Sequence, residues 1–241
     1  MLRPLAVVAL VVLAGCTGFA GGESQTERVT AAPVPSVDAS LVEVPTTNGS
    51  VDVDAVRQRH DAALAGRSFT RHVERAGPQN TRDVWVDREA DIVRVRRSFG
   101  PLVDDAIAAD GTVYRVASDD PDRAYVSAAS NETVPYVPSA SGADRLGQVL
   151  LDDGYRRVDT VERDGRPLAV LAVNATGRGD GPDPSLAVRS RLYVDADGII
   201  RIVDHWERRP DGTVVDFRMS VATGTGSVPV PWWAEDIGLY G

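Results

Sequence analysis

The chain has 241 residues, and its 43% hydrophobic content is enough for a core in one large domain. All 26 basic residues are arginine, against 35 acidic residues, which gives a net charge of −9 and an isoelectric point near 4.8. This charge argues against binding to nucleic acid. An acidic, lysine-free composition favours adaptation to high salt, where salt screens the repulsion between carboxylates. A GC-rich genome that prefers arginine codons is the alternative explanation.

The first fifteen residues have the pattern of an export signal. Arg3 precedes the ten-residue apolar run Leu5–Ala14, which is too short to span a bilayer but long enough for the core of a signal peptide. The run ends in Leu13-Ala14-Gly15-Cys16, which resembles the lipobox of prokaryotic lipoproteins. We therefore expect cleavage before Cys16, a diacylglyceryl group on its thiol, and anchoring to the extracytoplasmic face of the cell membrane. An ordinary secretory signal is the alternative.

Cys16 is the only cysteine, so no disulfide can form within the chain. Residues 16–50 are rich in Gly, Ser, Thr, Pro and Glu, and their apolar residues show no sustained period. Such a segment predicts a disordered tether. Residues 51–241 are then expected to form a single domain.

Three segments of this domain have helical patterns. A helix is predicted over Val53–Ala65, with Asp52 as N-cap and Gly66 as its end. A second is predicted over Gly142–Leu151, where Ser141 and Asp144 have the spacing of a capping box. Pro101–Ala109 is interpreted as a short helix with proline in its first turn.

The rest of the domain alternates with a period of two, which is typical of strands. Asp164-Gly165, Asp197-Gly198 and Asp211-Gly212 separate strand-like runs, and Asp-Gly is favoured in hairpins that need positive φ. Strands are predicted at Phe69–Arg75, Arg82–Asp87, Asp91–Ser98, Thr112–Ala117, Arg123–Ser127, Tyr155–Arg163, Pro167–Ala175, Leu186–Asp195, Ile199–Arg208 and Thr213–Thr223. The fold class is therefore α+β, mainly β: a strongly curved antiparallel sheet of about ten strands, a half-open barrel covered by two or three helices.

Catalytic and metal-binding patterns are absent from the sequence. The histidines His60, His72 and His205 do not have metal-ligand spacing, and His60 on the apolar helix face is interpreted mainly as a core residue. His72 and His205 have no evident partner. We therefore predict no enzyme, no cofactor and no metal.

Several other patterns have simple structural interpretations. Asp195-Ala-Asp-Gly198 lacks the remaining acids of a calcium loop and is interpreted as a hairpin turn. Residues 177–181 are glycine-rich but precede prolines rather than a helix, which favours a flexible loop over a phosphate cradle. The acid pairs Asp104-Asp105 and Asp152-Asp153 are expected to be solvated.

Two further features concern the surface. Asn48, Asn131 and Asn174 begin N-x-S/T sequons and are candidate glycosylation sites on an exported chain. Trp232 and Trp233 are adjacent, so at most one of them is expected to pack inward. Anchoring of the C-terminal segment on the sheet is favoured over contact with a ligand or partner.

Two resemblances cover much of the chain. The residues Leu13-Ala14-Gly15-Cys16, His60–Gly66 followed by Ser68-Phe69-Thr70, and Pro231-Trp232 resemble an uncharacterised group of haloarchaeal lipoproteins, from which no catalytic residues can be transferred. From residue 51 on, the order of elements resembles the LolA/LppX-type lipoprotein carriers. That resemblance implies a half-open barrel whose helices cover a hydrophobic cavity for acyl chains.

Three functions follow as hypotheses. The leading one is a membrane-anchored binding protein for an apolar, lipid-like ligand. The second is a structural or protein-interaction lipoprotein with a filled core. The third is an extracellular hydrolase, which would require a polar cluster with a histidine at the site.

Overall fold

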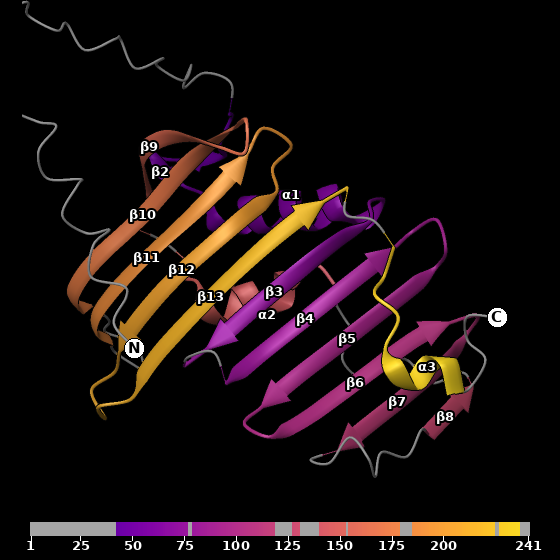
Figure 1. The fold of residues 1–241 in the computed structure, drawn as a ribbon. Coiled ribbons are helices and arrows are strands. Elements are labelled where there is room, and N and C mark those ends of the chain that lie inside the picture. The colour runs from indigo at the N-terminus through magenta and orange to yellow at the C-terminus, as the bar shows by residue number, and fades with distance from the viewer. Residues whose placement is uncertain are drawn as a thin grey trace, which may run out of the picture. The chain divides into compact units, whose positions relative to one another are not determined.

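The structure is a computed structural model that describes residues 42–76, 79–118, 127–130, 140–152, 154–178, 185–224 and 227–236 (Figure 1). The predicted signal peptide, Cys16, most of the predicted tether and Asn131 lie outside these residues. No helix in the described ranges is both long enough and apolar enough to cross a membrane.

One antiparallel sheet of eleven strands dominates the fold (Figure 1). The strand order is β8-β7-β6-β5-β4-β3-β13-β12-β11-β10-β9, so β3 and β13 join two meanders at the centre of the sheet. The edge strands β8 and β9 do not pair with each other, and the barrel is therefore open. The strands are β3 (Phe69–Arg75), β4 (Asn80–Asp87), β5 (Ile92–Phe99), β6 (Leu102–Ala109), β7 (Thr112–Ser118), β8 (Ser127–Ser130), β9 (Arg156–Arg163), β10 (Arg166–Arg178), β11 (Ser185–Asp195), β12 (Ile200–Arg208) and β13 (Val214–Thr223).

This sheet confirms the predicted fold class. The predicted hairpin turns are also confirmed: Asp164 and Gly165 have φ of 53° and 71°, and Gly198 and Gly212 have φ of 84° and 85°. Residues 123–126 of the weakest predicted strand lie outside the described residues, and β8 begins where that prediction ended.

The helices lie on both faces of the sheet. Figure 1 shows α1 (Val53–Ala65) and α2 (Ala143–Val149) behind the sheet and α3 (Trp232–Asp236) in front of β6 and β7. We call the side of α1 and α2 the helix-covered face. The predicted bounds and N-cap of α1 are confirmed, since Asp52 accepts a hydrogen bond from the Ala55 N–H at 2.9 Å.

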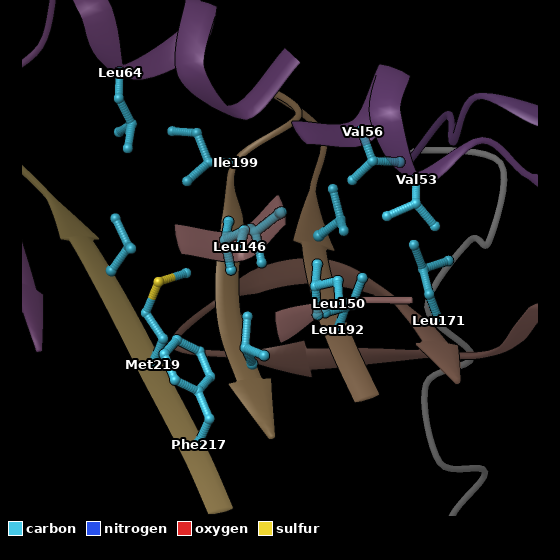
Figure 2. Packing of buried hydrophobic residues seen from close by; sticks show 14 of the residues in the cluster. Val53, Val56, Leu64, Leu146, Leu150, Leu171, Leu192, Ile199, Phe217 and Met219 are labelled. Carbon is cyan, nitrogen blue, oxygen red and sulfur yellow. The ribbon is translucent and has the colours of Figure 1, made fainter. Parts of the chain in front are cut away.

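The core fills the space between the sheet and these two helices. Figure 2 shows Val53, Val56 and Leu64 of α1 and Leu146 of α2 directed at strand residues such as Leu192 and Met219. Burial of these side chains is the main stabilising contribution to the fold. Most of the inside of the half-barrel is therefore occupied by the protein itself.

The helix predicted over Pro101–Ala109 is wrong, because residues 102–109 form strand β6. Its apolar run is compatible with both periods, and neighbouring strands decide between them. In the strand, Asp105, Ile107 and Ala109 are buried on one face, and Asp105 accepts hydrogen bonds from Arg94 of β5.

The N-terminus of α2 differs from the predicted capping box. Gly142, not Ser141, is the N-cap, in the left-handed region with φ of 85°, and Ser141 Oγ accepts only a long hydrogen bond from the Ala143 N–H, at 3.3 Å. The Ser141 hydroxyl instead donates to Asp61 of α1 at 2.5 Å, and Asp144 is exposed. The positive φ of Gly142 moves the helix start past Ser141.

The predicted tether is shortened at its C-terminal end, because residues 42–50 belong to the fold. Val42 is buried in the core, and its carbonyl accepts a hydrogen bond from Arg157 of β9 at 2.9 Å. A small ladder of β1 (Thr46–Thr47) and β2 (Ser50–Val51) follows. These contacts join segments far apart in the sequence, which composition cannot reveal.

Candidate ligand-binding pocket

An open cavity of about 310 Å³ remains on the helix-covered face, between α2 and the centre of the sheet. Its volume is at the lower end of the range for small-molecule sites. Strands β3, β4, β5, β6 and β13 and the start of α2 supply its lining: Arg71, Val73, Arg75, Asn80, Thr81, Arg82, Arg97, Ser98, Phe99, Leu102, Asp104, Gly142, Arg145, Phe217 and Met219. We call it the arginine pocket.

Strand register brings these side chains together. Val73 pairs with Arg82, and Arg82 pairs with Arg97 on the next strand. Arg97 in turn pairs with Asp104. Directly paired residues point to the same face of a sheet. One row across four strands therefore places two arginines side by side on the pocket wall.

Positive charge is concentrated here. Among the described lining residues, five are arginines, namely Arg71, Arg75, Arg82, Arg97 and Arg145, and one, Asp104, has a carboxylate. Asp104 already accepts two hydrogen bonds from Arg115 of β7, at 2.7 and 2.9 Å. The expectation that Asp104 and Asp105 are solvated is therefore wrong, since both lie in the sheet and pair with arginines.

These arginines influence one another. Burial and the charge of Arg82 lower the pKa of Arg71 to about 9. Burial and the charges of Arg97 and Arg145 lower the pKa of Arg82 to about 10. The cationic forms of these groups are thus less favourable here than in water, although all remain charged at neutral pH.

An apolar wall faces the charged one. Val73 and Phe217 are buried beneath the cavity, whereas Phe99 and Leu102 at its rim are 67% and 45% exposed. Phe99 and Leu102 are paired at the start of the β5–β6 hairpin. The pocket therefore offers both cations and apolar contact to a bound molecule.

A second cavity, of about 520 Å³, is lined by His72, Asp83 and Trp85 of the opposite face. Several of its charged groups have partners within the protein. His72 Nδ1 lies 2.6 Å from Asp83, and Arg201 in the same lining donates to Asp195 at 2.6 Å. The arginine pocket differs in its described lining, where five arginines and one carboxylate lie beside exposed apolar side chains.

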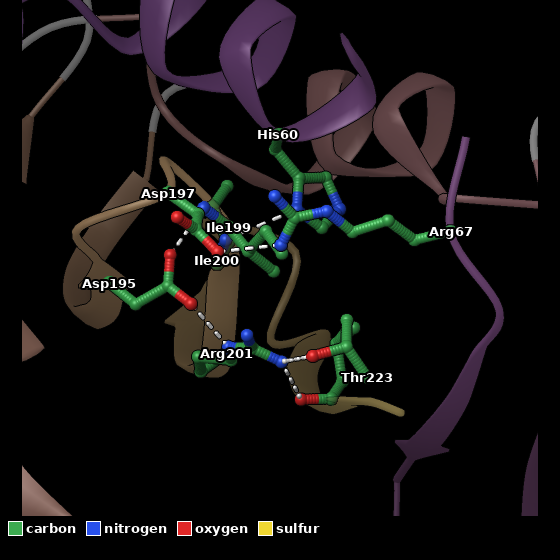
Figure 3. A network of polar contacts seen from close by, with 9 residues as sticks. His60, Arg67, Asp195, Asp197, Ile199, Ile200, Arg201 and Thr223 are labelled. Atoms are coloured by element: carbon green, nitrogen blue, oxygen red, sulfur yellow. Dashed lines mark hydrogen bonds and ion pairs between the residues drawn. The ribbon is translucent and has the colours of Figure 1, made fainter. Parts of the chain in front are cut away.

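His60 is confirmed as a core histidine (Figure 3). It is 0% exposed; its Nδ1 accepts from the Ile200 N–H at 3.1 Å, and its Nε2 lies 3.2 Å from the Ser141 carbonyl. The ring therefore joins α1 to the start of β12 and to the residue before α2. Burial lowers its pKa to about 4.

The turn at residues 195–198 is structural. Asp195 accepts from the Ile199 N–H at 2.9 Å and pairs with Arg201, while Asp197 pairs with Arg67 at 2.6 Å (Figure 3). The carboxylates of Asp195 and Asp197 thus already bind arginine side chains and, for Asp195, a backbone N–H. In the part of the chain that the structure describes, no group of three or more His, Cys, Asp or Glu could hold a metal ion.

The other two histidines lie on opposite faces. His72 does have partners, contrary to expectation: Asp83 at 2.6 Å and Glu74 at 3.3 Å. Burial lowers its pKa, but these two carboxylates outweigh that effect and raise it. His205 is buried opposite Ser190 on the helix-covered face, 3.7 Å from Glu207.

Ser190, His205 and Glu207 are the residue types of a hydrolase triad, so their contacts matter for the hydrolase hypothesis. The Ser190 hydroxyl accepts from Tyr155 at 2.7 Å. Neither ring nitrogen of His205 makes a hydrogen bond within the described ranges. A nucleophile bonded to its base is therefore not formed in this cluster, which is also buried.

The remaining predicted residues lie at the surface or beside the sheet. Asn48 and Asn174 are exposed. Trp233 is 1% exposed and Trp232 is 57% exposed, which confirms that only one packs inward. Of the glycine-rich loop, residues 179–181 lie outside the described residues, as does Asp153.

No protein-family model matches the chain, and no curated protein matches it. Solved structures are similar to the chain over about three quarters of its length. A chain of the MucA/MucB complex of Pseudomonas aeruginosa is 19% identical over 74% of this chain and 59% of that chain, with a TM-score of 0.37.

Two mycobacterial proteins are also similar. The lipoprotein LppX of Mycobacterium tuberculosis is 12% identical over 73% of this chain and 98% of its own, with a TM-score of 0.39. LprF of Mycobacterium bovis is 9% identical over 78% of this chain and 99% of its own, with a TM-score of 0.42. The chain thus spans less than two thirds of the MucA/MucB complex chain, but nearly all of LppX and LprF. At these identities and TM-scores the similarity carries no inference about a ligand.

Proposed function

We propose that this protein is a non-enzymatic lipoprotein that is anchored outside the cell membrane and holds a lipid-like ligand in the arginine pocket. The observation that supports it most is the open cavity beside a filled core, with Phe99 and Leu102 exposed at its rim. Exposed apolar side chains around a concave site are typical of ligand or partner binding.

The ligand site is smaller than the cavity expected from the sequence. Side chains of α1 and α2 fill the space that an acyl chain would occupy in an empty half-barrel. Among the described residues, the cavity beyond α2 remains open on this face. A ligand there would have one apolar end on Phe99 and Leu102 rather than be enclosed.

The direct test is to purify the full chain from its native membrane, extract it with organic solvent and measure bound lipid by mass spectrometry. One lipid per protein is expected. Absence of lipid, and no uptake of any added amphiphile, would overturn the proposal.

Membrane anchoring has its own test. Replacement of Cys16 by Ser removes the thiol that would carry the lipid, so the Cys16→Ser protein should be released to the medium or keep its signal peptide. Fractionation and N-terminal mass spectrometry measure this. Membrane retention of a correctly cleaved Cys16→Ser protein would contradict a lipid anchor.

A protein-interaction function is the second candidate. The filled core and the exposed Trp232 on α3 favour it, because exposed tryptophans are enriched where proteins meet. In that case the pocket would stay empty in the lipid-extraction experiment.

A further inference from the structure

The β5–β6 hairpin ends in two large apolar side chains. Phe99 is 67% exposed and Leu102 is 45% exposed, and the two residues pair directly across the hairpin. Gly100 and Pro101 connect them and are exposed as well. Exposed apolar side chains that are grouped together, rather than scattered singly, mark a surface that meets an apolar partner. We call these four residues the apolar tip.

The neighbouring turn fixes the position of the apolar tip. The Gly100 N–H donates to the Gln79 carbonyl at 2.9 Å, and Phe99 pairs with Asn80 at the start of β4. Figure 1 shows this end of β5 beside the start of β4. The tip is therefore the end of the sheet itself, and its apolar side chains are held outward by strand pairing.

The opposite ends of the same two strands carry carboxylates. Asp91 directly precedes β5, Asp110 directly follows β6, and both are exposed. Glu89, in the same turn as Asp91, is exposed too. A carboxylate loses its hydration when it enters a bilayer, whereas an apolar side chain is stabilised by leaving water. This hairpin therefore favours one direction of approach to a bilayer, with the apolar tip first.

The size of the apolar tip fits a bilayer better than a protein partner. A stable protein–protein interface buries about 800 Å² and roughly 20–30 residues on each side, far more than four tip residues supply. A bilayer requires less, because a lipid on Cys16 would already hold the chain at the surface, and the tip then only orients it. Cys16 lies 26 positions before Val42, the first described residue, and a chain of that length reaches up to about 90 Å. The tip is therefore within reach of the membrane.

We propose that the apolar tip inserts into the extracytoplasmic surface of the bilayer and turns the mouth of the arginine pocket towards the membrane. Phe99 and Leu102 also line that pocket, so a lipid-like ligand passes along them from the bilayer without crossing water. The open rim of the pocket is then closed by the membrane. This inference rests on the proposed function and names its partner surface and the route of its ligand.

The test measures the depth of a spin label on the full lipidated chain in phosphatidylcholine vesicles. Cys16 is the only cysteine and its thiol would carry the lipid, so one introduced cysteine gives one labelled site. Pro101→Cys puts the label on the tip, and Ala90→Cys puts it on the exposed turn at the other end of β5. A water-soluble nickel complex should collide with the Pro101 label several-fold less often than with the Ala90 label. Molecular oxygen, which dissolves in the bilayer, should show the reverse.

Matched variants separate insertion from mere closeness to the vesicle. Phe99→Ser with Leu102→Ser changes only exposed side chains of the tip. In that background the Pro101 label should become as accessible to nickel as the Ala90 label. Trp232→Ser removes an equally exposed apolar side chain on α3, and it should leave the Pro101 label shielded. Thermal melting of each variant checks that the fold is kept.

Each outcome decides a different point. Equal nickel access at Pro101 and Ala90 in the unaltered tip would overturn insertion and leave ligand binding intact, because lipid extraction does not depend on the tip. A Pro101 label that stays shielded after both serine substitutions would also overturn insertion, since another surface would then face the bilayer. A chain without lipid on Cys16 that does not float with the vesicles would overturn both the anchor and the insertion.

Discussion

His60 makes stability depend on pH. Its neutral ring accepts from the Ile200 N–H through Nδ1, so the other nitrogen carries the proton toward Ser141. In the protonated ring Nδ1 also carries a proton, so an N–H would face the Ile200 N–H, which needs an acceptor there. Protonation therefore breaks a contact between α1 and β12.

The pH dependence of unfolding follows from the lowered pKa. The unfolded chain binds a proton at His60 near pH 6.5, whereas the folded one does so near pH 4. Between these values the unfolded state holds more protons, so stability is lost as the pH falls, by up to about 3 kcal/mol. Urea unfolding at pH 7, 6 and 5 in constant salt measures this, and His60→Gln should flatten the slope between pH 6.5 and 5.

The control variant is His72→Gln. The raised pKa of His72 means that its contribution is present at low pH and is lost as the pH rises through the folded-state pKa. Removing it should therefore steepen the loss of stability on acidification. Equal slopes in the wild type and His60→Gln would show that His60 is not the titrating group.

The residues of the arginine pocket show what sequence reasoning missed. Arg71, Arg82, Arg97 and Arg145 are spread over 75 positions of an arginine-rich chain, and each alone is typical of a solvated strand or helix face. The register of β3, β4 and β5 places Arg71, Arg82 and Arg97 around one cavity, and α2 adds Arg145. The burial of His60 was easier to predict, because the helical spacing of neighbouring apolar residues places it on the apolar face of one helix.

At the scale of elements, the helix α3 is docked mainly through Trp233. Trp233 packs on Ile107 and Val116, and its Nε1 donates to Asp105 at 3.4 Å. Arg94 strengthens the attachment, since it pairs with Asp105 and donates to the Pro229 carbonyl at 2.6 Å. The segment after β13 is thus fixed to the face opposite α1 and α2.

Trp233→Ala should destabilise the protein by about 3 kcal/mol, because truncation of a buried tryptophan leaves a cavity and removes one hydrogen bond to Asp105. The adjacent Trp232 is a matched control, and Trp232→Ala should change the free energy of unfolding by less than about 0.5 kcal/mol. Urea unfolding measures both. A similar cost for the two variants would mean that α3 is not docked through Trp233.

Three hairpins and α1 could be predicted from their turn and capping residues, whereas β6 was missed although Gly100 and Asp110-Gly111, all with positive φ, bound it. Asp-Gly pairs marked three hairpins, and Asp52 and Gly66 marked α1, because each imposes a local backbone conformation. Residues 101–109 have no such signal inside the run. There the pairing of Arg94 with Asp105, from the neighbouring strand, selects the strand over a helix.

For the whole molecule, the acidic surface predicts a need for salt. With net −9 and no lysine, repulsion between carboxylates should loosen the domain as the Debye length grows from ~3 Å at 1 M salt to ~10 Å at 0.1 M. The melting temperature should therefore rise with NaCl across that range. A flat curve would instead favour codon bias as the origin of the composition.

The central pairing of β3 with β13 has a consequence for how the molecule assembles. All other neighbouring strands in the large sheet are consecutive along the chain, whereas the β3–β13 pair joins residues as far apart as Val73 and Met219. Pairing at such separation is slow, because a long loop must close first. During synthesis from the N-terminus, strands β3 to β8 are completed before β13 is made. Until then one edge of β3 has no neighbouring strand, and such a free edge can pair with the wrong strand. The last strand to be made thus protects the first, and loss of β13 would leave two separate sheets, each with an open inner edge.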